Sequence, residues 1–225
     1  MKLSLSDRLL ACAGFVHPGD RVADVGCDHG YLGIHLLQNG IASHVYASDV
    51  REGPLSSAKR NAAHYGVAEQ MDCFLSDGVR DLPRDFDTLG CAGMGADTMI
   101  SILTDVPWLK SEKYRLILQC QSKTPMLRQY LSENGWCIQE EAALRDGRFL
   151  YTVMDVHWQP DAHRLTVGQR YFPPALLKTP TPETQEYYHW VLEGLRVAAE
   201  HRPEETILQA LSELEALPLG KEEQT

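Results

Sequence analysis

The sequence lacks the features that mark membrane and secreted proteins. No apolar run in its 225 residues approaches the roughly 20 residues that a membrane-spanning helix needs. The first residues also lack the apolar core of a signal peptide. We therefore expect a cytoplasmic protein that does not interact with membranes.

Metal-site and disulfide patterns are missing as well. The six cysteines include no C-x-x-C pair, and the nine histidines show no metal-ligand spacing. Most cysteines lie inside or at the ends of apolar runs, which is typical of small, buried, reduced residues. A nucleophilic Cys120 is the less favoured alternative. The sequence predicts no metal.

Runs of lysine or arginine are absent, and the net charge is −10. An acidic total usually argues against nucleic acid as a partner. However, residues 181–225 hold three basic residues against ten glutamates, so most of the negative charge lies there. The preceding 180 residues are nearly balanced in charge and can still present a basic face.

Strand-like and helix-like segments alternate through most of the chain. After a short amphipathic helix capped near Ser6, the apolar patterns predict strands at 21–26, 44–49, 71–76, 88–92 and 115–119. Helices are predicted at 31–39, 52–65, 97–103 and 125–134, and three of them close at a glycine. This alternation predicts an α/β domain with a parallel sheet between two layers of helices.

The end of the predicted sheet has a different pattern. Segments 137–144 and 148–157 are strand-like and are joined by Arg145-Asp146-Gly147, which favours an antiparallel hairpin. A parallel sheet that ends in such a hairpin is the Rossmann-like class I methyltransferase arrangement. We assign residues 1–158 to this domain. Residues 159–225 are read as a proline-rich linker and a small C-terminal α-helical hairpin, too small to fold alone.

A glycine loop follows the first strand, and its acidic residues restrict the ligand. Gly26, Gly30 and Gly33 do not match the G-x-G-x-x-G spacing of dinucleotide sites. A carboxylate such as Asp24 or Asp28 at about 4 Å from a phosphate costs on the order of 4 kcal/mol at an effective dielectric constant of about 20. S-adenosylmethionine (SAM) carries an ammonium and a sulfonium and no phosphate, so the same acids attract it.

Two further acids follow the next strands. Asp49 ends the second strand, where an acid normally binds ribose hydroxyls, and Asp77 follows the third, within reach of an adenine amino group. A single strand-end aspartate is more often a helix cap or turn residue, and for Asp77 the two interpretations are equally weighted. His29 either orients the loop or contacts the ligand. Several signals agree on one crevice, which favours a cofactor.

The segment Cys91-Ala92-Gly93-Met94-Gly95-Ala96 is predicted to form a loop after the fourth strand. The Asn/Asp-Pro-Pro-aromatic motif of methyltransferases that act on nucleobase nitrogens is absent. Two glycines instead permit a flat ligand to approach the backbone, and Met94 offers a polarizable contact. The alternative is a simple turn with Met94 in the core.

Taken together, these motifs resemble the bacterial tRNA adenine-22 N1-methyltransferases, a Rossmann-like family with a C-terminal helical extension. The matching segments span nearly the whole chain and are Leu5-Ser6-Asp7-Arg8-Leu9, residues 23–32, Asp49, Glu52-Gly53-Pro54-Leu55, Ala92-Gly93-Met94-Gly95, Leu118-Gln119, Leu127-Arg128 and Arg148-Phe149-Leu150-Tyr151. The resemblance implies SAM as cofactor, tRNA as substrate, and methyl transfer to N1 of an adenine.

We therefore predict three groups of site residues. The cofactor group comprises Asp24, Gly26, Cys27, Asp28, His29, Gly30, Asp49, Asp77, Gly78, Ala92 and Gly93. The catalytic group comprises Asp28, Gly93 and Met94. The substrate group comprises Arg8, Tyr31, Met94, Gln119 and Tyr151. Phosphate contacts would come from a spatial cluster among Arg8, Lys123, Arg128, Arg145, Arg148 and Lys178, although such side chains are usually only solvated.

Two other functions stay open. The acidic total charge favours a small-molecule methyltransferase of the same fold. A non-catalytic nucleotide-binding module is the second alternative, with the stripe of Leu208, Leu211 and Leu214 contacting a protein partner. That stripe most simply packs within the chain itself, so we expect a monomer, with a dimer as the alternative.

Overall fold

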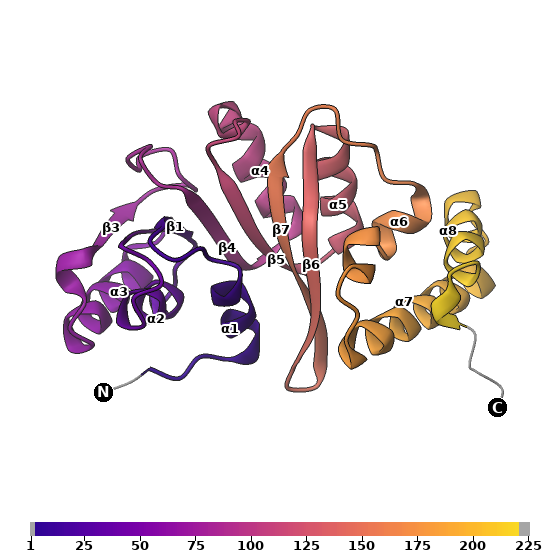
Figure 1. Cartoon of the computed structure of the whole chain (residues 1–225), viewed down its shortest axis with the longest axis horizontal. Helices are drawn as coiled ribbons and strands as arrows, with labels where there is room; N and C mark the ends of the chain where they lie inside the picture. Colours follow the sequence, from indigo (N-terminus) through magenta and orange to yellow (C-terminus); the bar gives the residue numbers. More distant parts are fainter. Residues whose placement is uncertain (1–2, 221–225) are drawn as a thin grey trace.

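Seven strands form one mixed sheet in the computed structural model, which describes residues 3–220 (Figure 1). The strand order is β3-β2-β1-β4-β5-β7-β6. The strands are β1 (Arg21–Val25), β2 (His44–Asp49), β3 (Met71–Leu75), β4 (Thr88–Gly95), β5 (Arg115–Ser122), β6 (Trp136–Asp146) and β7 (Phe149–Trp158). The first five pair in parallel, and β7 pairs antiparallel with β5 and β6. The predicted Rossmann-like methyltransferase sheet with its terminal hairpin is confirmed.

Helices cover both faces of this sheet. The helices α1 (Asp7–Gly14), α2 (Tyr31–Gln38) and α3 (Glu52–His64) pack on one face, and α4 (Ala96–Asp105) and α5 (Thr124–Glu133) pack on the other. Strand side chains alternate between the two cores, as Val22 and Ala23 do in β1. Short 3-10 turns lie at Ala68–Gln70, Pro107–Leu109, Pro174–Leu177 and Pro218–Gly220. The helices predicted at 31–39, 52–65 and 125–134 are confirmed to within one residue at each end.

The predicted loop after residue 92 is wrong, because β4 continues through Gly95. Its pairing with β5 shifts register between Ala92 and Met94 and again between Met94 and Gly95. Gly93 lies within the first shift and has φ of +84°, a left-handed conformation that glycine adopts without strain. A β-bulge therefore replaces the loop, and such a bulge bends the end of a strand. Composition alone does not distinguish this bulge from a turn.

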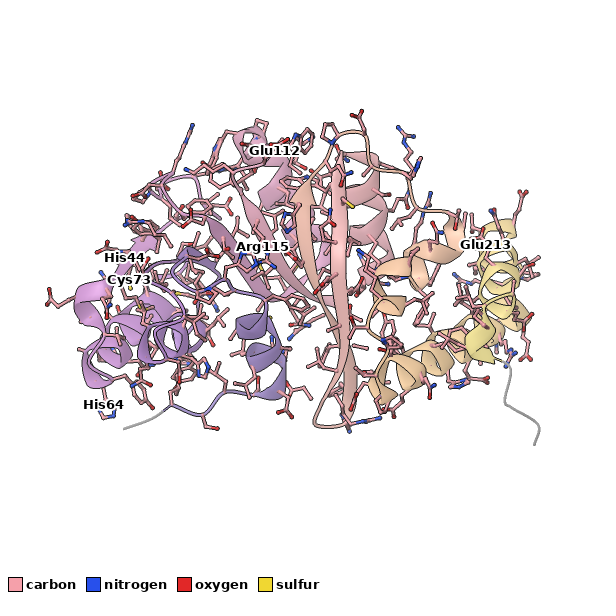
Figure 2. The ribbon with its side chains drawn as sticks, in the orientation of Figure 1. His44, His64, Cys73, Glu112, Arg115 and Glu213 are labelled. Carbon is pink, nitrogen blue, oxygen red and sulfur yellow. The ribbon has the colours of Figure 1, made fainter. Side chains whose placement is uncertain are left out.

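The C-terminal hairpin consists of α7 (Pro182–His201) and α8 (Glu205–Glu215), as predicted. A short helix that the sequence did not predict, α6 (Val167–Tyr171), lies in the proline-rich linker. Glu213 of α8 accepts the backbone N–H of Gly168 at 2.9 Å, and Figure 2 shows Glu213 between α8 and α6. The phenol of Tyr188 donates to the carbonyl of Leu214 at 2.9 Å, which joins α7 to α8. These helices form a third core together with Ala143 of β6.

Residues 1–2, part of the stretch judged for a signal peptide, and residues 221–225, the end of the predicted segment 159–225, lie outside the described residues. Within the part that the structure describes, no helix is both long and apolar enough to span a bilayer.

Arg128 joins the helical extension to the sheet. Its guanidinium is fully buried and lies 2.5 Å from the Glu141 carboxylate. The same group donates to the carbonyls of Arg170 and Tyr171 in α6, at 2.9 and 2.8 Å, and to the Tyr187 phenol of α7 at 3.3 Å. Arg128 is therefore not available for the phosphate contact considered above. One buried cation holds α5, β6, α6 and α7 together.

We predict that Arg128→Met lowers the free energy of unfolding by about 3–5 kcal/mol, because the buried Glu141 carboxylate loses its partner. Urea denaturation measures this change. The double variant Arg128→Met/Glu141→Met should recover most of the loss, since both charges are then gone. Arg196→Met, which breaks an exposed 2.9 Å pair with Glu215, is the control and should cost less than about 1 kcal/mol. A similar small loss for Arg128→Met would contradict the role of the network.

Candidate active site

A cavity of about 560 Å³ opens at the carboxyl ends of β1, β2, β3 and β4. The direction of the strand order changes between β1 and β4, and the crevice at such a switch point is the usual ligand site of these sheets. Most of the predicted cofactor group lines it, namely Asp24, Gly26, Cys27, Asp28, His29, Asp49, Asp77, Gly78, Ala92 and Gly93. Arg8, Tyr31 and Met94 of the substrate and catalytic groups line it too.

The turn after β1 has a tightly defined shape. Gly26 has φ of +68°, and a Cβ atom placed on it would lie 2.0 Å from the Met94 methyl carbon. The N–H of Cys27 donates to the Ser48 carbonyl of β2 at 2.9 Å, and the N–H of Gly30 donates to the Cys27 carbonyl at 2.7 Å. Any side chain at position 26 would therefore displace Met94. Met94 thus occupies the space that a side chain at this glycine would need.

Gly30, also predicted to bind the cofactor, lies behind the cavity wall, where it packs against β3 and α3. It has φ of +74° and immediately precedes α2, and a Cβ atom there would lie 2.8 Å from the Met71 methyl carbon. Gly30 thus lets α2 begin close to β3 and α3.

Asp24 is the buried carboxylate of the cavity, with only 3% of its surface exposed. Burial raises its pKa to about 6, and the N–H of Gly33, 3.3 Å away, partly offsets that rise. Dehydration disfavours the charged form, which explains the direction of the shift. An ionised Asp24 therefore strongly favours a cationic ligand group.

Asp28, His29 and Tyr31 lie at the more exposed side of the cavity. The Asp28 carboxylate lies 3.6 Å from the His29 ring nitrogen, and the rings of His29 and Tyr31 stack at 5.5 Å. Asp28 has φ of +50°, a left-handed backbone that is uncommon outside glycine. Strained backbone of this kind is concentrated at functional sites.

Asp49 and Asp77 differ in their surroundings. Asp49 is buried and accepts the backbone N–H of Arg51 at 3.0 Å. Asp77 is exposed, and Arg80 lies 3.6 Å from it. The Gly78 carbonyl accepts the Ser48 hydroxyl at 2.9 Å, which ties the turn after β3 to β2. Of the two acids that follow β2 and β3, Asp49 therefore lines the cavity as a buried residue and Asp77 as a solvent-exposed one.

The structure places Gln119 and Tyr151, both predicted to bind substrate, away from this cavity wall. Gln119 is fully buried, and its carbonyl oxygen accepts from Arg8 Nη1 at 3.0 Å and from the Gly93 N–H at 3.1 Å. Gln119 thus positions Arg8 over the bulge in β4. Tyr151 lines a second cavity beside the first.

Several lining residues were not predicted, among them Arg51, Thr98 and Gln121. Gln121 lies on β5 beyond residue 119, where the strand was predicted to end. The two-residue period that relates Gln119 to Gln121 is the signal that could have found it. No sequence signal for Thr98 is evident.

The cysteines near the cavity are neutral thiols. Burial raises the pKa of Cys27, Cys91 and Cys120, and Cys120 donates to the Ser122 carbonyl at 3.0 Å. Thiols with raised pKa values are poor nucleophiles, which favours the structural interpretation of Cys120. Over residues 3–220 the structure brings no three metal-ligating side chains together.

Sequence comparisons identify related enzymes. The chain is 30% identical over 154 residues to the Bacillus subtilis tRNA (adenine(22)-N(1))-methyltransferase, covering 68% of this chain and 65% of that protein. It is 31% identical to a putative tRNA methyltransferase of Mycoplasma pneumoniae, covering 76% of this chain and 80% of that protein. The aligned region thus spans slightly less than two thirds of the Bacillus subtilis enzyme.

Structural comparison extends the similarity over almost the whole chain. A Streptococcus pneumoniae putative tRNA (m1A22) methyltransferase in complex with S-adenosyl-L-methionine superposes with a TM-score of 0.83 at 28% identity, covering 94% of this chain and 98% of that one. A model of the methyltransferase domain matches residues 5–154, which include every strand end around the first cavity. The chain therefore belongs to the methyltransferase domain family.

Proposed function

We propose that this chain is a SAM-dependent methyltransferase that modifies N1 of adenine 22 in tRNA. The observation that carries the proposal is the buried Asp24 carboxylate in an acidic cavity at the switch point of a methyltransferase sheet. Relatives that carry the same activity in their names support the choice of substrate. A tRNA substrate also fits the expected cytoplasmic location, and we propose a monomer as the active form.

The residues around the cavity fit SAM. Asp24 and Asp28 suit its cationic methionine end, Asp49 suits the ribose hydroxyls, and Asp77 suits the adenine amino group. The bulged end of β4, with Gly93 and Met94, borders the same space. When bound, SAM supplies the methyl group from its sulfonium. The chain's own acids bind and orient that donor, and they disfavour phosphate-bearing ligands.

Methylation of adenine N1 needs little base catalysis, because the ring lone pair is free at neutral pH. The residues must align N1 with the methyl group and balance the positive charge that enters the base. Asp28 is placed for the second task, either through its charge or by accepting a hydrogen bond from the exocyclic amine. N1 lies on the pairing edge, so the nucleotide must be unpaired or flipped out. Tyr31, exposed at the side of the cavity, can stack on the extruded base.

The small-molecule alternative is supported by the net charge of −10. The similarity to tRNA methyltransferases supports the RNA substrate. The two functions differ in the acceptor and share the cofactor, so an assay must identify the methylated product.

Incubation of the chain with SAM and unmodified tRNA should produce a single primer-extension stop at adenine 22, because N1 methylation blocks base pairing. Mass spectrometry of the digested tRNA should identify 1-methyladenosine. Affinity for the tRNA should also fall steeply with salt, as counterions compete for phosphate contacts. SAM binding without any new stop would contradict the tRNA assignment.

Asp28→Asn should lower kcat by about tenfold at saturating SAM, and should also weaken SAM binding, because Asp28 lines the cavity at the cationic methionine end of the donor. Asparagine tolerates the left-handed backbone, so the variant isolates the loss of charge. Removing a single preorganised group from a water-excluded site typically lowers kcat by about 100-fold. The effect expected for Asp28 is smaller, because its side chain is more than half exposed and solvent and salt screen its charge. Single-turnover methylation with saturating SAM measures the effect. Full turnover in the variant would remove the role of Asp28.

Asp24→Asn should stabilise the ligand-free protein at neutral pH and weaken its binding of S-adenosylhomocysteine, which keeps the ammonium of SAM. The pKa of Asp24 is raised from 3.8 to about 6 in the folded state, so the folded state binds this proton more tightly than the unfolded state. The resulting stabilisation is complete below pH 4 and is lost as the pH rises through 6. Ionisation thus costs up to about 3 kcal/mol at pH 7.

Chemical denaturation between pH 4 and pH 8 measures this difference. The wild type should lose stability over that range relative to the variant, and the two curves should converge at pH 4. Calorimetry at pH 8 should show at least a tenfold weaker affinity in the variant. Parallel stability curves would contradict the buried charge, and equal affinities would contradict its role in cofactor binding.

A further inference from the structure

A second cavity of about 630 Å³ lies between the catalytic sheet and the helical extension. One wall comes from the end of β5 and the start of α5, and another from the start of β7. The opposite wall is α7, which contributes Tyr187, Trp190, Val191 and neighbouring residues at helical spacing. Figure 1 shows the turn of the β6–β7 hairpin between α1 and α7. The first cavity lies on the α1 side of this hairpin, and the second lies on its α7 side.

The walls of the second cavity are mainly apolar and aromatic. Trp190 is 60% exposed although it is a large apolar side chain, and its ring lies 5.7 Å from that of Tyr187. Tyr151 and Tyr171 add two more aromatic side chains. An exposed tryptophan on the wall of an aromatic cavity is suited to stacking on a flat ring, and every nucleobase presents such a face.

The second cavity adjoins the first. Gln121 at the end of β5 lines both of them. Lys123, which follows, lies on the second cavity with φ of +58°, and among described residues only Lys123 and Asp28 combine a side chain with positive φ. One strained residue therefore marks each cavity, at the carboxyl ends of β5 and β1 respectively.

The charges around the second cavity differ from wall to wall. Lys123 and the N-terminus of α5 lie on one wall, where the exposed Lys123 ammonium pairs with the exposed Asp97 carboxylate at 2.8 Å and can exchange it for a phosphate. The exposed Arg148 precedes Leu150 and Tyr151 of another wall. Glu193 lies on the α7 wall, and Glu186 and Glu200 follow the same exposed face at seven-residue spacing. Phosphates are favoured on the Lys123 side and disfavoured along α7. A nucleotide can satisfy both sides if its base, and not its phosphate, points toward Trp190.

We propose that this second cavity binds the base of a tRNA nucleotide that neighbours the methylated adenine in space. The inference rests on the proposed function, because it takes the first cavity as the site of methyl transfer. The bound base would replace stacking that is lost when the target adenine leaves its helix. Trp190 is the main stacking residue, and Lys123 contacts the phosphate backbone.

The test measures the affinity of unmodified tRNA in the presence of S-adenosylhomocysteine at fixed salt. Trp190→Ala should weaken tRNA binding roughly 5- to 150-fold, the range that loss of one base-aromatic stack gives. Trp190→Phe should retain most of the affinity. Leu208→Ala is the matched control, since Leu208 is an exposed apolar residue of the same extension, 47% exposed and outside both cavities. The affinity for S-adenosylhomocysteine should be the same in all variants.

Abasic tRNAs identify the bound nucleotide. Removing one base near adenine 22 should weaken tRNA binding to the wild type by the same factor as Trp190→Ala does. The Trp190→Ala variant should bind this abasic tRNA and the intact tRNA with equal affinity. Equal tRNA affinity of wild type and Trp190→Ala would overturn the inference, and so would abasic losses that are the same in both at every position. Binding and catalysis separate the two proposals: tRNA binding through Trp190 without methyl transfer contradicts only the proposed function.

Discussion

A single buried carboxylate sets the conditions for the rest of the active site. Asp24 is almost completely removed from solvent at the end of β1, and its ionised form destabilises the ligand-free fold. The surrounding residues keep that site narrow, because the Met94 methyl group packs directly against Gly26 and the Gly33 N–H donates to the Asp24 carboxylate. The ionised carboxylate therefore lowers the stability of the ligand-free fold, and a bound cation compensates its charge. Functional residues commonly reduce stability in this way. Specificity for a phosphate-free, positively charged donor follows from this one interaction.

Arg128 plays the corresponding role for the acceptor side. The hairpin of α7 and α8 is too short to fold by itself, and its position depends on the sheet. The Arg128 guanidinium bonds Glu141 of β6, backbone carbonyls of α6 and the Tyr187 phenol. Because Tyr187 also lines the second cavity, the same network that attaches the extension fixes the wall on which Trp190 lies. One buried ion pair therefore both attaches the extension and positions the wall that we propose to bind a base.

Local patterns in the sequence were sufficient for most helices and strands and for the acids of the first cavity, but not for α6. Strand ends of a parallel sheet meet at one edge, so acids such as Asp24 and Asp49 could be placed together without a structure. The bulge at Gly93 was missed, since glycine composition does not distinguish a bulge from a turn. Arg128 could not be predicted, because burial depends on α6 and α7, far along the chain. The positioning role of Gln119 likewise depends on Arg8, over a hundred residues away.

The distribution of charge is compatible with the RNA substrate that we propose for this acidic protein. The glutamates concentrate in the C-terminal helices, whereas Lys123 and Arg148 lie beyond the carboxyl end of β5 and just before β7, on the side of the second cavity that faces the sheet. A screening length of about 8 Å at physiological salt means that a phosphate senses mainly the charges of the nearest element. The net charge therefore says little about binding on that side. In the proposed complex, the glutamates of α7 and the cations Lys123 and Arg148 instead limit the path of the phosphate backbone, so the charge that argued against RNA would determine its orientation.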